Sequence, residues 1–368
     1  MTNPATTYQP LGNFIRKVDN RNRDLKVKNL VGLTIEKAFI PSVANIIGTD
    51  LSNYKVIRKR QFACSLMQVS RDGKMPIAMF AEEEGIMSPA YPMFEVADEK
   101  VLLPEYLMMW FARSEFDREA SYYAVGGVRG SLEWDDFCAM RIPVPPIAEQ
   151  RAVVAEYAAV QHRMEVNKRL IAKLEETAQT LYKKMFVDGV DKENLPDGWR
   201  MGTLGEVCII KAGGDAPEMV SEKPNDICQY PIYANGFENN GLYGYTDKPK
   251  ITKPSITISA RGTIGFCCIR KKPYVPIVRL IVIIPNNDEL LNYLGLHFKM
   301  SRIEGDGSVQ GQLTVPNVEE YNIAIPSDSD LLKFNKLYNT IDSEIEILEK
   351  EIEKLTDIQT LLLARMGR

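Results

Sequence analysis

Apolar residues recur at alternating steps of four and three along two stretches of this chain. In the first stretch the steps run from residue 153 to residue 185, and the same series returns 181 residues later. Nine of the ten positions are apolar in each stretch, and Glu, Lys and Arg fill the positions between them. This spacing is typical of a heptad seam, so it predicts two long helices that pack on each other as a coiled coil. The assigned seam residues are Val153, Tyr157, Val160, Met164, Asn167, Ile171, Leu174, Leu181, Phe334, Tyr338, Ile341, Ile345, Leu348, Ile352, Leu355 and Leu362.

Asn167 is the one polar residue in the first seam. A single seam asparagine can fix the register of a coiled coil. The alternative is a solvated asparagine at the edge of the seam, and the sequence leaves both interpretations open.

The offset of 181 also aligns a second pair of segments without a gap. Residues 126–145 match residues 307–326, so that Leu132 meets Leu313 and Ile142 meets Ile323. An internal repeat of this kind predicts two copies of one scaffold. We therefore expect an α/β mixed (α+β) fold with four parts: globular domains at 1–145 and 187–326, and spacer helices at 146–186 and 327–368.

Pairing of the two helices is expected to be antiparallel. A parallel pair would require the intervening domain to travel back along the length of a helix, whereas an antiparallel pair places one domain at each end, related by a pseudo-two-fold axis. At about 1.5 Å per residue, a helix of about 36 residues is roughly 54 Å long.

Proline marks the first boundary between domain and helix. The run IPVPP ends a predicted strand, because Pro145 and Pro146 cannot donate to a β-ladder and proline is tolerated in a first helical turn. At the second boundary the run IAIPS offers Ser327 and Asp328 as N-cap residues instead.

Within the globular domains, alternating and β-branched stretches predict strands at 30–43 and 55–69. Residues 253–269 predict two strands around a turn at Arg261-Gly262. A spacing of three and four predicts helices at 105–123 and 289–303. Residues 230–248 are rich in Gly and Asn and are predicted to form loops.

Composition narrows the class of protein. Of the 368 residues, 45% are hydrophobic and 26% charged, with a net charge of −4. Basic and acidic residues number 18 and 18 in residues 1–145, and 14 and 17 in residues 187–327, so a DNA-binding surface must be a local patch. No apolar run is long enough to predict a membrane span, no signal peptide is indicated, and the six cysteines lack paired spacing. We expect a cytoplasmic protein.

Several common catalytic motifs are absent from the sequence. It contains no GxxxxGK[ST] loop, no GxSxG elbow and no Asn-Pro-Pro-aromatic or Asp-Pro-Pro-aromatic tetrapeptide, and its two histidines have no cluster of metal ligands beside them. The acidic runs 82–84 and 135–136 are interpreted as solvated surface, although a metal-dependent nuclease would also need acidic residues. We predict no catalytic, cofactor-binding or metal-binding residues.

Basic and amide side chains remain as candidates for binding nucleic acid. Lys and Arg clusters suit phosphate contacts, Arg can read guanine and Asn can read adenine. The bland alternatives are a soluble charged face and, for the asparagines, turns with a left-handed backbone. The candidates are Arg21, Arg23, Lys26, Arg58, Lys59, Arg60, Lys211, Asn235, Asn239, Tyr243, Lys248, Arg261, Arg270 and Lys271.

These features together resemble one protein family. The boundary PVPPIAEQRAVVAEYAAV, the helix end LEETAQTLYKKMF, the repeat, and the run LG…YPIYANG…YGYTD…ISARGTIG look like the specificity subunit of type I restriction–modification enzymes. The second boundary, IAIPSDSDLLKFNKL, departs from the pattern because it has lost most of the prolines and the AEQ triplet.

The resemblance implies two target-recognition domains, each reading one half of a split site in double-stranded DNA. It implies that the chain has no activity of its own and binds two methyltransferase (modification) subunits, which use S-adenosylmethionine. Restriction (translocase/endonuclease) subunits, which use ATP and Mg, are implied as further partners. Residues 146–186 and 327–368 inherit the docking role, and no membrane is involved.

Two other classes of function stay open at this point. One is an enzyme, a nuclease or methyltransferase with its own recognition domain. The other is a coiled-coil scaffold that binds only proteins. Salt-dependent, sequence-specific DNA binding would separate the specificity subunit from the scaffold.

Overall fold

The chain forms two compact units. The computed structural model describes residues 8–42, 48–67, 69–126, 130–191, 193–301 and 312–367. Unit 1 comprises Met1–Asn167 and Lys350–Arg368, and unit 2 comprises Lys168–Glu349. Each unit therefore contains one globular part and a portion of both long helices.

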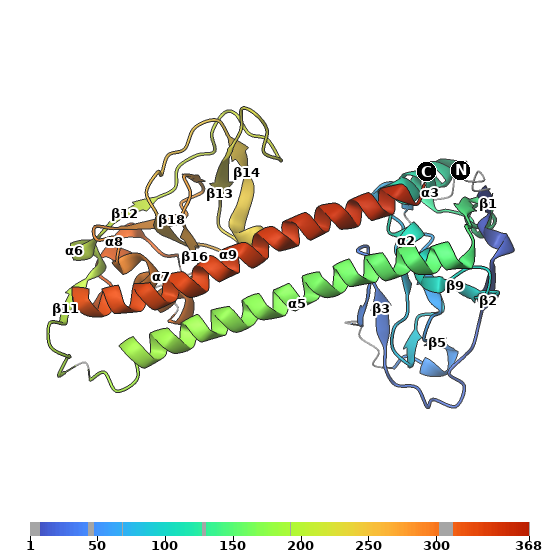
Figure 1. Cartoon of the computed structure of the whole chain (residues 1–368), viewed down its shortest axis with the longest axis horizontal. Coiled ribbons are helices and arrows are strands. Elements are labelled where there is room, and N and C mark those ends of the chain that lie inside the picture. The colour runs from blue at the N-terminus through green and yellow to red at the C-terminus, as the bar shows by residue number, and fades with distance from the viewer. Residues whose placement is uncertain are drawn as a thin grey trace. The chain divides into compact units, whose positions relative to one another are not determined.

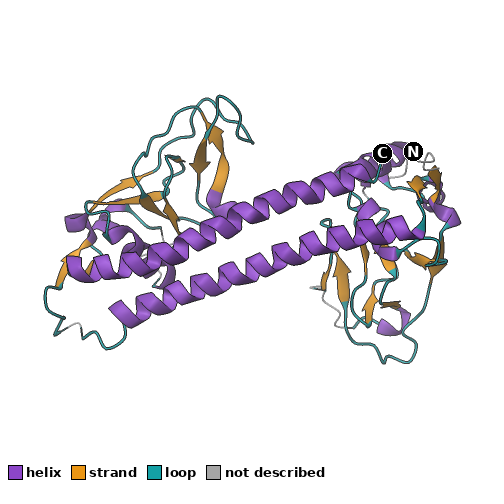
Figure 2. Ribbon diagram, viewed as in Figure 1, coloured by secondary structure: helices purple, strands orange, loops and turns teal. Residues whose placement is uncertain are grey.

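Two uninterrupted helices dominate the chain, α5 (Ile147–Phe186) and α9 (Asp328–Arg365) (Figures 1 and 2). In unit 1 an early turn of α5 meets a late turn of α9, where Gln359 Nε2 donates to Tyr157 Oη at 3.0 Å. In unit 2 a late turn of α5 meets an early turn of α9, where the rings of Phe186 and Phe334 lie 5.0 Å apart. The helices are thus antiparallel, and the predicted two-helix coiled coil is confirmed.

Unit 1 packs short helices against small antiparallel sheets. The main sheet has the order β2-β9-β6-β7, and the pairs β1-β10, β3-β4 and β5-β8 form separate ladders. Phe62 stacks on Phe94 at 5.1 Å, and Phe111 packs edge-on against Phe62, which forms the centre of the core. The strands are β1 (Tyr8–Pro10), β2 (Ile15–Val18), β3 (Val31–Leu33), β4 (Phe39–Pro41), β5 (Lys55–Arg58), β6 (Phe62–Cys64), β7 (Ile77–Met79), β8 (Glu84–Met87), β9 (Met93–Val96) and β10 (Arg141–Pro143). The α-helices of this globular part are α1 (Val69–Asp72), α2 (Pro104–Phe111), α3 (Ser114–Tyr123) and α4 (Trp134–Ala139).

Unit 2 has a four-stranded sheet of order β12-β18-β15-β16 and a three-stranded sheet of order β14-β13-β17. All five residues of β18 are buried, because Ile281 and Ile283 pack in the main core of unit 2 while Val282 and Ile284 pack in a second apolar cluster. The strands are β11 (Arg200–Thr203), β12 (Cys208–Ala212), β13 (Tyr230–Tyr233), β14 (Leu242–Thr246), β15 (Ser255–Ile258), β16 (Cys267–Arg270), β17 (Val275–Pro276), β18 (Ile281–Pro285) and β19 (Asn322–Ile325). The α-helices of this globular part are α6 (Leu204–Val207), α7 (Leu290–Met300) and α8 (Val315–Glu319).

The internal repeat is visible in the frame of each unit. Strand β1 pairs with β10 in unit 1, and β11 pairs with β19 in unit 2. A turn follows the first strand of each ladder. In the turn after β1, Leu11 N donates to Met140 O at 2.8 Å, and in the turn after β11, Leu204 N donates to Tyr321 O at 3.1 Å. The two acceptors, Met140 and Tyr321, are 181 residues apart, so the two units contain equivalent hydrogen bonds at this turn. Parts of the aligned segments, residues 127–129 and 307–311, lie outside the described residues.

Two predicted elements of the globular parts were wrong. The helix expected at 105–123 is two helices, because Arg113 has an extended backbone (φ −74°, ψ 140°) and its guanidinium lies 4.2 Å from the Trp110 ring centre. The loops expected at 230–248 contain an antiparallel hairpin of β13 and β14. Their glycines and asparagines lie mainly in the connection, while the alternating Tyr and Ile residues form the strands.

The two long helices begin differently. In α5, Glu149 N donates to the Pro146 carbonyl oxygen at 2.9 Å, so the proline step itself forms the first turn. In α9, Ser327 Oγ accepts from Asp330 N at 3.2 Å, which is an N-cap of the expected type. Among the described residues, no helix is long and apolar enough to cross a membrane.

Candidate nucleic-acid interface

The first basic cluster of unit 1 is neutralised by its own neighbours. Arg21 Nη2 lies 2.9 Å from Asp19 Oδ1, and Arg21 Nη1 donates to Asn53 O at 2.8 Å. The hydrogen bond from Arg21 holds the pKa of the Asp19 carboxyl below its ordinary value. Arg23 Nη1 donates to Asn53 Oδ1 at 3.0 Å. These contacts tie the arginines to the turns around them.

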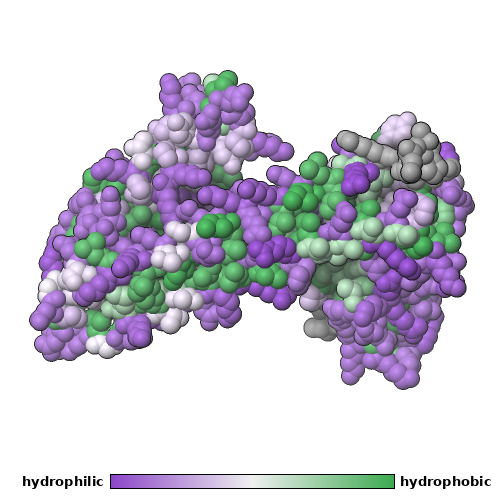
Figure 3. Space-filling model, viewed as in Figure 1, coloured by the Kyte–Doolittle hydropathy of each residue, from purple (hydrophilic) through white to green (hydrophobic). Residues whose placement is uncertain are grey.

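Lys26 and Lys59 are paired in the same way. Lys26 Nζ lies 2.9 Å from Asp24 Oδ2, and Lys59 Nζ lies 2.7 Å from Glu83 Oε1. All four side chains are more than half exposed, so these ion pairs are screened and weak. Figure 3 shows the visible face of unit 1 around β5 as mainly hydrophilic.

Arg60 has an internal role in unit 1. It lies at the turn after β5 with φ +68°, and its Nη2 donates to Glu99 Oε2 at 2.9 Å and to Glu105 Oε2 at 3.1 Å. Because Glu105 belongs to the first turn of α2, Arg60 fastens the β5–β6 turn to that helix. Arg58, by contrast, is exposed and has no ion-pair or hydrogen-bond partner for its side chain within the described ranges.

The basic pair at the end of β16 is also engaged. Arg270 is buried, its guanidinium carbon lies 3.5 Å from the Tyr233 ring centre, and its Nε donates to Thr257 Oγ1 at 3.0 Å. Lys271 Nζ lies 2.9 Å from Glu346 Oε1 and also bonds Asp342, both on α9. Arg270 therefore supports the sheet, and Lys271 ties the sheet to the long helix.

The candidate asparagines have structural contacts. Asn235 Oδ1 accepts from Ala260 N at 2.8 Å, and its Nδ2 donates to Val278 O at 2.7 Å. Asn239 and Asn240 have φ values of +47° and +54°, the left-handed region that asparagine tolerates. Their geometry agrees with the turn alternative for this segment.

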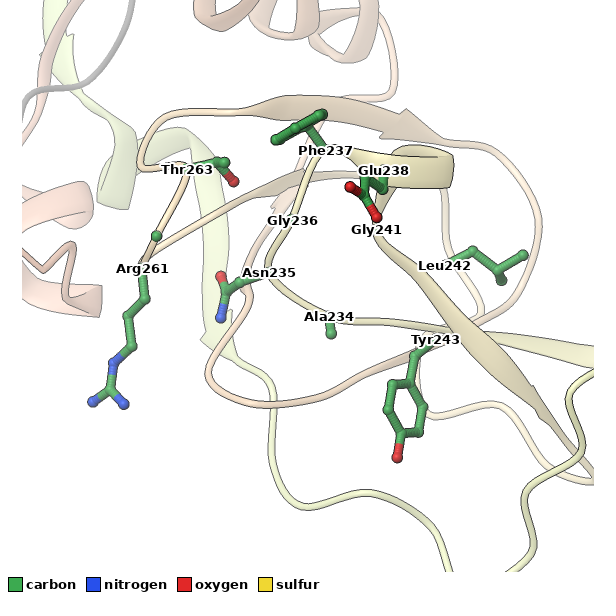
Figure 4. A pocket seen from close by; sticks show the side chains of 11 residues that line it. Ala234, Asn235, Gly236, Phe237, Glu238, Gly241, Leu242, Tyr243, Arg261 and Thr263 are labelled. Carbon is green, nitrogen blue, oxygen red and sulfur yellow. The ribbon is translucent and has the colours of Figure 1, made fainter. Parts of the chain in front are cut away.

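An open cavity of about 350 Å³ lies over the loops of unit 2 that carry these asparagines (Figure 4). Two aromatic rings at its wall are exposed, Phe237 by 61% and Tyr243 by 58%. Thr263 Oγ1 also lines it and has no hydrogen-bond partner within the described residues. The cavity thus combines apolar walls with an unused polar atom.

Arg261 is the cation at this cavity. It lies in the turn between β15 and β16, is exposed, and donates from Nη2 to Gln312 Oε1 at 2.9 Å. The contact orients the guanidinium and leaves Nη1 and Nε without a partner inside the described ranges. Lys211 on β12 and Lys248 after β14 are exposed and unpaired within the same ranges.

Sequence reasoning missed one exposed cation in this part of unit 2. Arg279 follows Val278 in a turn where both residues have positive φ, +58° and +53°. A β-branched residue with positive φ is an outlier, and such strain gathers at functional sites. Nothing in the run PIVRL predicts a left-handed turn, so no sequence signal could have found it.

Each globular part is joined to a long helix by a buried amide. Gln150 on α5 is fully buried, its Oε1 accepts from Leu103 N at 2.9 Å, and its Nε2 donates to the Val101 and Pro145 carbonyl oxygens, both at 2.8 Å. This glutamine belongs to the AEQ triplet, so at least that residue of the triplet has a structural role, in which it joins α5 to the globular part of unit 1.

In unit 2 the corresponding amide is Asn335 on α9. Its Nδ2 donates to Glu289 O at 2.8 Å, and its Oδ1 accepts from Asn292 Nδ2 at 2.9 Å. On α5 of the same unit, Tyr182 Oη lies 2.9 Å from His297 Nδ1, and His297 Nε2 lies 2.9 Å from Tyr321 Oη. Both long helices are therefore tied to the globular part by polar contacts.

The assigned seam residues are all buried or half-buried. Asn167 is 1% exposed, which rules out the solvated alternative, and its Nδ2 lacks a hydrogen-bond partner of good geometry within the described residues. Beside the seam, Arg163 Nε lies 2.8 Å from Glu351 Oε1, and this hydrogen bond lowers the pKa of the Glu351 carboxyl. The buried seam residues are Asn167, Phe334, Tyr338 and Leu348. The half-buried ones are Val153, Tyr157, Val160, Met164, Ile171, Leu174, Leu181, Ile341, Ile345, Ile352, Leu355 and Leu362.

No group of three or more His, Cys, Asp or Glu side chains is placed to hold a metal ion among the described residues. The arrangement instead offers exposed donors, aromatic rings and paired charges. Such groups can contact phosphates and base edges.

Comparison with known proteins identifies the family. Residues 196–357 match the family model of the type I restriction modification DNA specificity domain. A Mycoplasma pneumoniae sequence named as a type I specificity subunit is 30% identical over 166 residues, which are 42% of this chain and 49% of that protein. The match thus spans about half the length of that relative.

A second sequence from the same organism, named as the C-terminus of a type I specificity subunit, is 32% identical over 120 residues, which are 30% of this chain and 83% of that protein. Among solved structures, the S subunit of a type I restriction-modification system from M. genitalium has the same fold, with a TM-score of 0.58 and 17% identity over 98% of this chain and 95% of that one. The chain therefore belongs to the family of type I restriction–modification specificity subunits.

Proposed function

We propose that this chain is the DNA-recognition subunit of a type I restriction–modification complex, in which each globular part reads one half of a bipartite target. The observation that carries this proposal is the repeated frame, in which the ladders β1-β10 and β11-β19 each lead into one of two antiparallel helices. A protein with two similar recognition parts on a rigid support can bind two half-sites at a fixed separation.

In this proposal the DNA contacts are divided by type. Exposed cations that lack a partner within the described residues, such as Arg58, Lys211 and Lys248, contact phosphates and position the protein. The cavity of unit 2, with Arg261 and Tyr243 at its wall, contacts base edges. In this proposal the cations of unit 1 that are paired with carboxylates keep the protein soluble and do not contact DNA.

The long helices set the separation of the half-sites and dock two methyltransferase subunits in this proposal. Exposed apolar side chains on both helices support a protein contact: Leu170 is 43% exposed, Ile347 57% and Leu361 68%. The chain itself carries no catalytic step. S-adenosylmethionine binds the methyltransferase subunits, and restriction subunits with ATP and Mg²⁺ complete the complex in the cytoplasm.

The test is co-production of this chain with its methyltransferase subunit in cells, followed by mapping of every methylated base in the genome. We expect a two-part motif with a fixed spacer, seen only when both proteins are present. Methylation by the purified chain alone, or methylation without a sequence motif in the complex, would contradict the proposal.

An insertion tests the spacing role directly. Four residues added to both long helices lengthen each by about 6 Å, which is close to two base pairs at about 3.4 Å each. We expect both half-sites of the motif to persist with a longer spacer between them. An unchanged spacer would show that the helices do not set it.

A further inference from the structure

A single amide holds two arginine-bearing loops of unit 2 together. Asn235 Oδ1 accepts from the backbone N–H of Ala260, and its Nδ2 donates to the carbonyl oxygen of Val278. Arg261 and Arg279 are the next residues of these two loops. The two arginines thus emerge from backbone segments that are joined through one side chain, although they are 18 residues apart in sequence.

The turn that carries Arg279 is strained and firmly held. Val278 N donates to Gly214 O at 2.9 Å, and Arg279 N donates to Gly213 O at 3.0 Å. A Cβ at Gly213 would lie 2.8 Å from Ile277 N, so only glycine permits this close approach. A left-handed turn at two non-glycine residues persists only when its surroundings fix it, and these contacts do so.

Both guanidinium groups keep hydrogen-bond donors that have no partner within the described residues. Arg279 is exposed and has no ion-pair or hydrogen-bond partner for its side chain within the described residues, and Arg261 bonds only Gln312 there. Figure 4 shows Asn235 between Arg261 and Tyr243, whose side chains extend toward the same side of the view. Among the described residues that line the cavity, the carboxylate is that of the exposed Glu238.

We infer that Arg261 and Arg279 form a guanine-reading pair in unit 2, and that Asn235 is the positioning residue that sets their separation. This inference rests on the proposed function. A guanidinium donates two parallel hydrogen bonds to guanine O6 and N7, a contact that requires accurate placement. Phosphate contacts need only a nearby positive charge, which would not require a strained and braced backbone. The exposed rings of Phe237 and Tyr243 add apolar contacts of the kind that base edges accept.

The inference changes the interpretation of Asn235. The sequence suggested an adenine reader, but both polar atoms of its amide are engaged by backbone groups. Its role in recognition is therefore exerted through the two loops that it joins.

The experiment uses the complex with the methyltransferase subunit and maps methylated bases for Arg279→Ala, Arg279→Lys and Asn235→Ala. For Arg279→Ala we expect one G·C position in one half of the motif to become degenerate, with discrimination reduced about 10- to 100-fold. Arg279→Lys should not restore it, because lysine lacks the planar fork. Asn235→Ala should relax the same position together with the one read by Arg261, and the other half of the motif should stay unchanged.

Arg200→Ala is the matched control, because Arg200 is an exposed arginine of unit 2 on β11, paired with Glu206 at 2.7 Å. It should leave the motif intact. If Arg279→Ala lowers methylation at every site equally and weakens the salt dependence, the contact is to phosphate and the inference fails. If the wild-type complex itself shows no two-part motif, the proposed function fails instead. Arg261→Lys provides an independent variant if Arg279→Ala does not accumulate.

Discussion

The junctions between globular part and long helix are alike in the two units, but their residues differ. Gln150 in unit 1 bonds Leu103 N, the residue before α2, whereas Asn335 in unit 2 bonds Glu289 O, the residue before α7. At the offset of 181, Gln150 corresponds to Leu331, and Asn335 corresponds to Val154. The fastening amide has therefore moved by about one helical turn between the units.

The repeat therefore preserves the contact between the long helix and the globular part, although the residue that makes this contact differs between the units. The second boundary lacks the AEQ triplet, yet its helix is still tied to the start of the preceding helix by a buried amide. Leu331 at the aligned position is buried in the apolar core of unit 2. The loss of the triplet therefore leaves the junction intact.

The exposed surfaces diverge more than the junctions. In unit 1 the cations Arg21, Lys26, Lys59 and Arg60 all have carboxylate partners. In unit 2 the engaged cations Arg270 and Lys271 serve the frame, while Arg261 and Arg279 stay exposed at braced turns. A shared frame with different exposed groups is what two readers of different half-sites require.

Removal of the Gln150 amide should have the largest effect on stability. Gln150→Leu deprives the Leu103 N–H and the Val101 and Pro145 carbonyl groups of their partner, at a cost of about 1–3 kcal/mol for each group that water does not reach. We expect unit 1 to lose about 3–5 kcal/mol of unfolding free energy, measured by denaturant titration. Gln161→Ala, an exposed glutamine on the same helix, should change stability by less than about 0.5 kcal/mol. Equal effects of the two substitutions would refute the fastening role.

The equivalent change in unit 2 should cost less. Asn335→Ala removes the bonds to Glu289 and Asn292, but Asn292 keeps a second acceptor in Asn339 at 3.3 Å. We expect a loss of about 2 kcal/mol, with faster hydrogen exchange in the first turn of α7. Asn339→Ala is the control and should have a clearly smaller effect, because Asn339 is exposed. A larger loss than for Gln150→Leu would reverse the comparison.

Periodic features could be predicted from sequence, and contacts between distant loops could not. The heptad seams and the 181-residue offset follow from spacing alone, so the long helices and the repeated frame were found. The break at Arg113 was missed because no Gly or Pro marks it, and the packing of Arg113 on Trp110 is a tertiary contact. The joining of Ala260 and Val278 through Asn235 depends on tertiary structure, so the sequence indicated the residue but not its role.

A smaller effect is expected where unit 2 ties its sheet to α9 by charge. Lys271 is 38% exposed as a side chain, so its pairs with Asp342 and Glu346 are partly screened. Lys271→Met should cost about 0.5–1 kcal/mol at low salt and less at high salt. Lys59→Met in unit 1, which removes a more exposed pair, is the comparison. If added salt does not reduce the difference in unfolding free energy between wild type and Lys271→Met, Lys271 stabilises unit 2 by packing and not by charge.

The smallest effect concerns the first turns of the two helices and depends on pH. Asp330 Oδ2 accepts from Trp199 Nε1 at 2.9 Å, and this bond, with one from Ser327, holds the pKa of Asp330 below its ordinary value. A carboxyl with a lowered folded-state pKa stabilises the fold above its unfolded-state pKa, and the contribution is lost as the pH falls through the folded value. Asp330→Asn should therefore destabilise unit 2 by about 0.5 kcal/mol near neutral pH, and the difference from wild type should vanish in acid. The first turn of α5 begins at Pro146 without such a carboxylate bond. If the difference in unfolding free energy between Asp330→Asn and wild type stays constant across the pH range, the effect comes from altered hydrogen bonds and not from the charge of Asp330.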